Sequence, residues 1–338
     1  MDAVRSVVDS GWFVLGPRVR EFEKDFAEFV GAGDCIGVGN GTDAIELALR
    51  ATGVAPGSEV VTVANAGGYA SAAIRSIGAT PVYVDVDPET LLVSPEAVRG
   101  TLGEATAAIV VTHLYGRVAP VDQIVGIAGD RAVPVIEDCA QAHGATVGGA
   151  HVGTVGTLGC FSFYPTKNLG ALGDAGAIVG DDQDLMGHVR RLRQYGWSQK
   201  YHRTEPGGRN SRLDELQAAV LSALLPNLDE WNRRRCEIGL AYRDGISHPD
   251  IRHVPIRDGD VVHLAVVETG RRQSLEAHLG GLGIATDVHY PAPDHAGSET
   301  RLPVTETACE SVLTLPCFPE MIDAEIEMVI EGVGSWRP

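Results

Sequence analysis

Lys167 stands in the stretch FSFYPTKNLGALGDAGA (161–177), which contains no other basic residue. The chain has only three lysines, and arginine carries most of its positive charge. A free lysine amine has a pKa of about 10.4 and is a poor nucleophile at neutral pH. Desolvation, or condensation with an aldehyde, removes the charge and makes an apolar position tolerable. Lys167 is therefore a candidate nucleophile toward an aldehyde cofactor; the alternative is a lysine that extends along the surface.

A second candidate is Asp138, which follows an apolar run in VIEDCAQAHGA (135–145). An acidic side chain that leaves a buried strand either caps a helix or pairs with a buried cation. A pyridinium nitrogen is such a cation, and a carboxylate against it keeps the ring protonated and electron-withdrawing. Gln141 and His143 follow closely in sequence and could reach the hydroxyl of the same ring or its surroundings.

A third candidate is the glycine-rich turn GNGTDA (39–44). Glycines let a turn approach a ligand closely, and the next helix offers a phosphate its unpaired N–H groups and positive dipole end. The alternative is that Thr42 only caps that helix. Ser162, shortly before Lys167, could add a hydrogen bond to the phosphate. A Schiff-base lysine, an acid on a pyridine nitrogen and a phosphate-binding helix start are the parts that a pyridoxal 5′-phosphate (PLP) site requires.

The elements that must position these residues alternate between strand and helix over the first two thirds of the chain. Strands are predicted at 35–40, 59–65, 80–87, 107–114, 132–138, 159–165 and 176–181, and helices at 43–52, 71–78 and 121–128. Such alternation predicts an α/β fold, with a mostly parallel sheet between two layers of helices. Ligands of such sheets gather at the carboxyl ends of the strands, so we expect the three candidates to meet at one edge.

The last third of the chain changes character. A long helical stretch at 213–245 leads into mixed segments and a terminal helix at 322–333, which predict a smaller α+β domain. We assign residues 1–230 to a large PLP-binding domain, with 1–15 as an N-terminal segment near the substrate pocket, and residues 231–338 to the small domain.

Composition excludes several classes of function. A hydrophobic content of 44% with 21% charged residues is ordinary for a globular protein. The net charge of −18 argues against binding to nucleic acid or to anionic membranes. The six cysteines show no C-x-x-C pair, and we expect no metal site. The N-terminus lacks the apolar region of a signal peptide, and no run approaches the ~18 apolar residues of a membrane span, so we expect a cytoplasmic protein.

One segment departs from the acidic average. Residues 190–212 hold seven basic residues against one acid, Glu205. Such an island suits a small anionic ligand, with Trp197 and Tyr201 available to stack; the alternative is a solvated basic loop.

The sequence resembles the fold-type-I sugar aminotransferases of the DegT/DnrJ type over nearly its whole length. The resemblance is carried, in the family's order, by GWFVLGPRVREFE, GNGTDAIELAL, GATPVYVDVDPETL, VTHLYG, VIEDCAQAHGA, CFSFYPTKNLGALGDAGA, LRQYGW, GGRNSRLDELQAAVL and GIATDVHYP. It implies an aspartate-aminotransferase-like fold and PLP as the cofactor.

The resemblance also implies roles for single residues. Lys167 matches the lysine that binds the cofactor aldehyde, and Asp138 matches the partner of the pyridine nitrogen. Gln141 would lie near the phenolic oxygen, while Ser162 and the backbone of Gly41 and Thr42 would hold the phosphate. Asn210 matches an asparagine that reaches the phosphate from the neighbouring subunit, which implies a homodimer with shared active sites. Substrate contacts are expected from Trp12, His113, Tyr115, Arg212, His289 and Tyr290.

Two departures from the family pattern stand out. Relatives usually carry an aromatic residue that stacks on the cofactor at a position occupied here by Gly67, and Tyr69 is the nearest ring in sequence. The stretch that ends at Trp12 is also short for a helix that helps to form the substrate pocket.

The implied reaction is amino transfer, with glutamate as the usual donor, to a nucleotide-linked keto-deoxyhexose. A keto-cyclitol is an alternative acceptor. Related sugar dehydratases have lost the lysine, commonly to histidine, so Lys167 argues against dehydration. A non-catalytic sugar-binding or regulatory protein on the same scaffold is disfavoured by the intact Lys167, Asp138 and Gln141.

Overall fold

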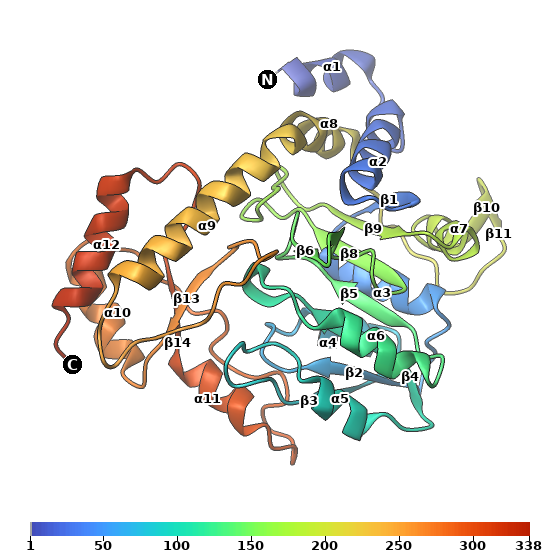
Figure 1. The fold of residues 1–338 in the computed structure, drawn as a ribbon. Coiled ribbons are helices and arrows are strands. Elements are labelled where there is room, and N and C mark those ends of the chain that lie inside the picture. The colour runs from blue at the N-terminus through green and yellow to red at the C-terminus, as the bar shows by residue number, and fades with distance from the viewer. Residues whose placement is uncertain (1) are drawn as a thin grey trace.

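The structure, a computed structural model, describes residues 2–338, and its centre is a seven-stranded sheet (Figure 1). The strands follow the order β1-β9-β8-β5-β4-β2-β3. Their bounds are β1 (Asp34–Val38), β2 (Glu59–Val63), β3 (Thr80–Val84), β4 (Thr106–Thr112), β5 (Val135–Asp138), β8 (Leu158–Ser162) and β9 (Gly176–Gly180). Strand β9 is antiparallel to β1 and β8, and the remaining pairs are parallel.

Helices cover both faces of this sheet. One layer comprises α3 (Gly41–Ala51), α4 (Tyr69–Ser76) and α7 (Gln183–Leu192). The other comprises α2 (Pro17–Val30), α5 (Pro95–Thr101), α6 (Val121–Gly129) and α8 (Glu215–Leu224). The central strands are buried on both faces and therefore read as apolar runs, as in TAAIVVT of β4. The predicted three-layer, mostly parallel α/β fold is confirmed.

The predicted strands mostly end two or three residues too late. The run 107–114 was assigned to one strand, whereas β4 ends at Thr112 and a 3-10 turn (Leu114–Gly116) follows. Two short hairpins were not predicted: β6 (Thr146–Val147) with β7 (Ala150–His151), and β10 (Trp197–Gln199) with β11 (His202–Arg203).

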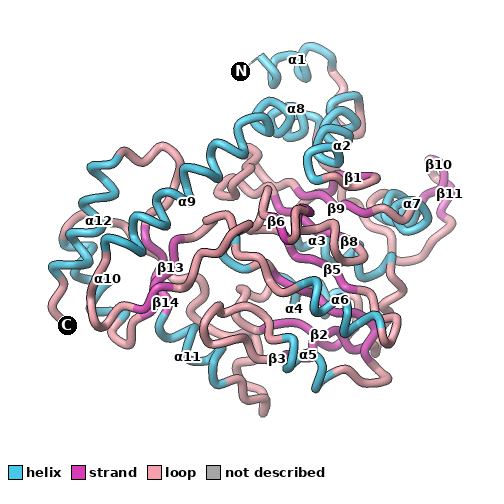
Figure 2. Tube along the Cα trace, in the orientation of Figure 1, coloured by secondary structure: helices cyan, strands magenta, loops and turns pink. Residues whose placement is uncertain are grey.

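The last third of the chain builds a second hydrophobic core. Helix α9 (Leu228–Gly245) leads into it, and a three-stranded antiparallel sheet packs with two further helices (Figure 2). The strands are β12 (Arg252–His253), β13 (Ala265–Glu268) and β14 (Val312–Leu315), and the helices are α10 (Arg272–Gly281) and α12 (Asp323–Ser335). Helix α11 (Pro303–Ser311) instead packs through Val304 and Ala308 against the core of the large sheet. The predicted boundary at 230/231 falls near the start of α9 and stays a prediction.

The N-terminal helix α1 (Asp2–Ser10) lies beside α8, far from the C-terminus (Figure 1). Over residues 2–338, no helix is both long and apolar enough to cross a membrane.

Candidate active site

A cavity of about 1000 Å³ opens at the carboxyl edge of the central strands. The sheet and its helices contribute Gly41, Thr42, Tyr69, Asp138, Gln141, Ser162 and Lys167 to its lining. The C-terminal third contributes His263, Asp287, His289, Tyr290 and Phe318. The structure therefore brings together every cofactor residue predicted for the chain's own site.

Lys167 presents an unpaired amine to this cavity. Within the described chain, its Nζ has neither a hydrogen bond nor an ion pair. Burial lowers the pKa of Lys167 to about 8, although the charge of Asp138 opposes this shift. The amine is therefore neutral in a much larger fraction of molecules than an exposed lysine, as a nucleophile requires.

Asp138 is the last residue of β5 and is 5% exposed. Its carboxylate accepts one hydrogen bond from the Ala140 N–H at 3.1 Å and a longer one from the Thr112 hydroxyl at 3.4 Å. Burial raises the pKa of Asp138, while the Ala140 N–H and the Lys167 charge act in the opposite direction. A pyridinium nitrogen is the kind of cation that would compensate this buried carboxylate.

The start of α3 provides a phosphate cradle. Asn40 caps the helix, because its Oδ1 accepts the Asp43 N–H at 2.8 Å. The alternative assignment of Thr42 as the cap is therefore wrong. Gly41 and Thr42 line the cavity, and their N–H groups, in the first turn of the helix, have no intrahelical acceptor. A Cβ on Gly41 would lie 2.7 Å from the Ser162 Cβ, so only glycine lets Ser162 come this close.

Gln141 is fixed in one orientation. Its Oε1 accepts the Tyr115 N–H at 2.6 Å, and its Nε2 donates to the Tyr290 hydroxyl at 3.0 Å. Tyr115 itself is 2% exposed and donates its hydroxyl proton to the His289 carbonyl at 2.5 Å. Tyr115 therefore lies outside the cavity lining and positions Gln141 and His289; its predicted direct contact with substrate is not what the structure shows.

His143 lies behind the site. The ring is fully buried, and its Nε2 bonds to the Ser162 carbonyl at 2.8 Å. Burial and the nearby Lys167 lower the pKa of His143 to about 3, so the ring stays neutral. The side chain of His143 therefore supports the end of β8, next to the cavity-lining Ser162, and its reach to the cofactor ring or its surroundings stays a prediction.

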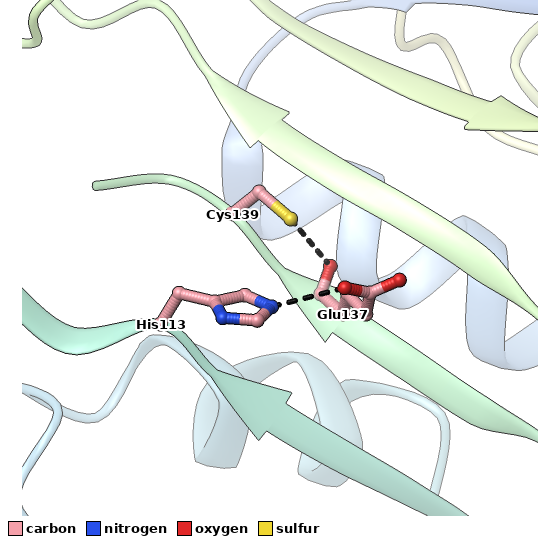
Figure 3. A group of neighbouring side chains, drawn as sticks. All are labelled: His113, Glu137 and Cys139. Atoms are coloured by element: carbon pink, nitrogen blue, oxygen red, sulfur yellow. Dashed lines mark hydrogen bonds and ion pairs between the residues drawn. The ribbon is translucent and has the colours of Figure 1, made fainter. Parts of the chain in front are cut away.

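His113 also points away from the cavity, into a buried group with Glu137 and Cys139 (Figure 3). Its Nε2 lies 3.0 Å from the Glu137 carboxylate, and its Nδ1 accepts the Ala119 N–H. Glu137 also accepts three backbone N–H groups from the loop 153–156. Burial alone would raise the pKa of Glu137, but His113 and these N–H groups lower it.

This group of three is therefore satisfied by the protein itself. The Cys139 thiol points to the Glu137 carbonyl, and both nitrogens of His113 are in use. The backbone N–H groups of the loop 153–156 bind Glu137 and so fasten this loop to β5. Together with His113, they leave no coordination position for a cation. The predicted substrate contact of His113 is wrong for the same reason.

The basic segment 190–212 is largely neutralised within the chain. Arg190, Arg191, Arg193 and Arg209 each form an ion pair with an acidic side chain. In the part of the chain that the structure describes, Lys200, Arg203 and Arg212 have no ion pair. The free anion-binding charge of this segment is thus smaller than the sequence suggested.

Three predicted residues lie away from the chain's own cavity. Trp12 is 53% exposed and donates its indole N–H to the Val14 carbonyl. Arg212 lies over the ring of Tyr195, with 5.9 Å between its Cζ and the ring centroid. Asn210 is exposed at the end of the segment that carries β10 and β11, and its role in a partner's site stays a prediction.

A buried network of hydrogen bonds beside Lys167 was not predicted. Asn168 bonds through its Oδ1 to His263 at 2.9 Å and through its Nδ2 to Asn232 at 2.8 Å. Arg235 then donates to the carbonyls of His263 and Cys317. This network connects the loop after β8, which carries Lys167 and Asn168, to α9 and to the rest of the C-terminal third. The only sequence signal was the position of Asn168 next to Lys167.

The residues present fit PLP. An unpaired amine, a buried carboxylate without a cationic partner in contact and a glycine-lined helix start share one cavity, and each matches one functional group of that molecule.

Known proteins give an independent comparison. The sequence matches the DegT/DnrJ/EryC1/StrS aminotransferase family over residues 1–334. A dTDP-3-amino-3,6-dideoxy-alpha-D-galactopyranose transaminase of Aneurinibacillus thermoaerophilus is 43% identical over an alignment of 343 positions, which covers 99% of this chain and 94% of that protein.

Two solved structures share the fold. DesV of S. venezuelae superposes with a TM-score of 0.96 at 39% identity, over 99% of this chain and 93% of that one. NtdA of Bacillus subtilis, with bound cofactor PMP, superposes with a TM-score of 0.93 at 29% identity, over 98% and 80% of the two chains.

Proposed function

Since the chain belongs to the DegT/DnrJ/EryC1/StrS aminotransferase family, we propose that its acceptor substrate is a nucleotide-linked keto-deoxyhexose and its amino donor L-glutamate. The protein is a PLP-dependent aminotransferase. The observation that carries the amino-transfer chemistry is the unpaired Lys167 amine, which shares a cavity with buried Asp138. The nucleotide-linked acceptor is supported by the relatives, such as the dTDP-amino-sugar transaminase of Aneurinibacillus thermoaerophilus. A non-catalytic scaffold would have no need to keep a lysine at this lowered pKa.

When bound, PLP supplies an aldehyde that condenses with amines and a ring that accepts the electrons of a cleaved C–H bond. Asp138 would hold the ring nitrogen in its protonated form. Gly41 and Thr42 would orient the phosphate with their N–H groups, and Ser162 would add its hydroxyl. Gln141, fixed by Tyr115, would position the phenolic oxygen.

Displaced from the cofactor aldehyde by the donor amine, Lys167 would act as the general base and acid. Its Nζ would take the proton from the donor's α-carbon and deliver it to the carbon that carries the cofactor aldehyde, after which water would release the donor as its keto acid. The same steps in reverse would transfer the nitrogen to the keto carbon of the sugar, whose oxygen leaves as water. Because the amine has no other partner in the described chain, it is free to move between these carbons.

We further propose that the active enzyme is a homodimer with shared sites. Asn210 is exposed near a protruding arm that carries β10 and β11 (Figure 1). Large apolar side chains are also exposed at Trp12, Phe13, Tyr195 and Tyr201. A second copy that covers these residues would explain their exposure and would bring Asn210 to the partner's phosphate cradle.

The substrate proposal is tested by isotope transfer. Holoenzyme is incubated with ¹⁵N-labelled L-glutamate and, in separate reactions, with dTDP-linked keto-deoxyhexoses and a free keto-cyclitol. Mass spectrometry should find ¹⁵N in a nucleotide-linked amino sugar, and Lys167→Ala should form none. If ¹⁵N appears only in the aminated cyclitol, the acceptor assignment is wrong. If glutamate transfers no nitrogen but another amino acid does, the donor assignment is wrong.

A further inference from the structure

Tyr290 lines the cavity and packs against Gly67, although Gly67 belongs to the large sheet region and Tyr290 to the C-terminal third. Gly67 has φ of +76°, in the left-handed region that favours glycine. A Cβ on residue 67 would lie 2.7 Å from Cε1 of Tyr290 and 2.9 Å from both Cδ1 and Cζ. Nearly equal distances to three consecutive ring atoms occur above a ring, not at its edge. The backbone of Gly67 therefore supports one face of the Tyr290 ring.

The other sides of Tyr290 are also held. Its hydroxyl accepts the Gln141 Nε2 at 3.0 Å. The preceding residue, His289, is held by the Tyr115 hydroxyl, and Tyr115 also holds Gln141. Burial and the nearby Tyr69 and Asp138 raise the pKa of Tyr290, so the phenol stays neutral.

Tyr69 has a different placement. It is 51% exposed, and its ring meets Tyr290 at 74° with 6.1 Å between the centroids. It thus flanks Tyr290 without a comparable set of restraints. The ring of Tyr290 is a fixed flat surface in a cavity that also contains Lys167 and Asp138.

We propose that Tyr290, not Tyr69, forms the aromatic wall on which the pyridine ring of PLP packs. Lys167 and Asp138 limit the position of that ring, because it must reach both side chains. Offset aromatic packing needs a ring held in place, and the backbone of Gly67 supplies that support to the Tyr290 ring whether or not its hydroxyl is present. Because Tyr290 belongs to the C-terminal third, cofactor binding is then coupled to how that part of the chain sits against the sheet.

The test measures PLP binding without any sugar or amino donor. Apoenzyme variants Tyr290→Leu, Tyr290→Phe and Tyr69→Leu are titrated with PLP, and the Kd and the visible circular dichroism of the bound cofactor are recorded. Tyr83→Leu, outside the cavity lining, is the matched control for the loss of a tyrosine. We expect Tyr290→Leu to raise the Kd about tenfold and to weaken the dichroic band, while the other three variants stay within about threefold of wild type.

A wild-type Kd and spectrum in Tyr290→Leu, or a larger effect in Tyr69→Leu, would overturn the proposal. Far-ultraviolet circular dichroism and Tm of each apoenzyme separate a binding loss from a folding defect. If Tyr290→Leu does not fold, Gly67→Ala gives a second reading, because its Cβ must displace the Tyr290 ring. Folded Gly67→Ala should show the same Kd increase, and unchanged binding would contradict the role of Tyr290. All of these readouts stay valid even if the proposed sugar substrate is wrong.

Discussion

At the scale of single residues, the Lys167 amine makes a prediction about pH. Its pKa is lowered to about 8 by burial, so the neutral amine predominates above that pH and protonation removes it below. Because only the neutral amine attacks an aldehyde, the rate at which apoenzyme captures PLP should rise with pH and level off slightly above pH 8. Stopped-flow absorbance over pH 6–10 measures this. A rate that still climbs steeply beyond pH 9.5 would mean that the lysine titrates like an exposed one.

A substitution at Asp138 is predicted to impair catalysis while leaving the stability of the fold almost unchanged. Asp138→Asn keeps an oxygen that can accept the Ala140 N–H, so we expect the Tm to change little. The neutral amide cannot hold the pyridine nitrogen in its protonated form. We expect the glutamate half-reaction to slow by about 10²–10³-fold, which corresponds to roughly 3–4 kcal/mol in the barrier. Near-normal turnover in a folded variant would contradict the assigned role.

The four predicted residues Lys167, Asp138, Gln141 and Ser162 share one cavity, but their hydrogen-bond partners could not be predicted from the sequence. Each of the four lies at the end of a strand or shortly after it and carries chemistry that few other roles require. His113 also follows a strand, yet its nitrogens are consumed by Glu137 and Ala119. A polar residue that contacts the ligand and one that fastens a loop look alike until the surrounding backbone is known.

At the scale of elements, the start of α3 depends on the lack of a side chain at residue 41. In Gly41→Ala the new Cβ would meet Ser162 at 2.7 Å and push β8 and α3 apart. We expect the Kd for PLP to rise about tenfold or more, because the N–H groups of the cradle move from the phosphate. Gly100→Ala, in α5 and with open space around the new methyl, is the control and should bind as wild type. Equal PLP affinities in both variants, measured by titration of apoenzyme, would argue against the cradle.

The order of strands and helices was readable because buried parallel strands are continuous apolar runs separated by amphipathic helices. The ends of the strands could not be predicted, because residues such as His113 and Leu114 stay buried beyond the last residue of the strand. The contact between Gly67 and Tyr290 could not be predicted from the sequence for another reason. It joins segments more than two hundred positions apart and depends on how the C-terminal third packs against the sheet.

At the scale of the whole molecule, the proposed shared site predicts complementation between two inactive variants. Lys167→Ala lacks the base, and Asn210→Asp places a negative charge where the partner's phosphate is expected. A heterodimer holds one site with both lesions and one with neither. On mixing, with subunit exchange shown by native mass spectrometry, activity should return to roughly a quarter of the wild-type value per site, the statistical share of intact sites. Exchange without recovered activity would confine Asn210 to its own chain.

The central claim is that Lys167 is the residue that engages the cofactor, and borohydride reduction tests it most directly. Holoenzyme is reduced, digested and analysed by peptide mass spectrometry, with Lys167→Ala treated in parallel. We predict one phosphopyridoxyl group per chain, on the peptide that contains Lys167, and none in the variant. Attachment to Lys24 or Lys200 in the wild type, or no covalent attachment at all, would contradict the account.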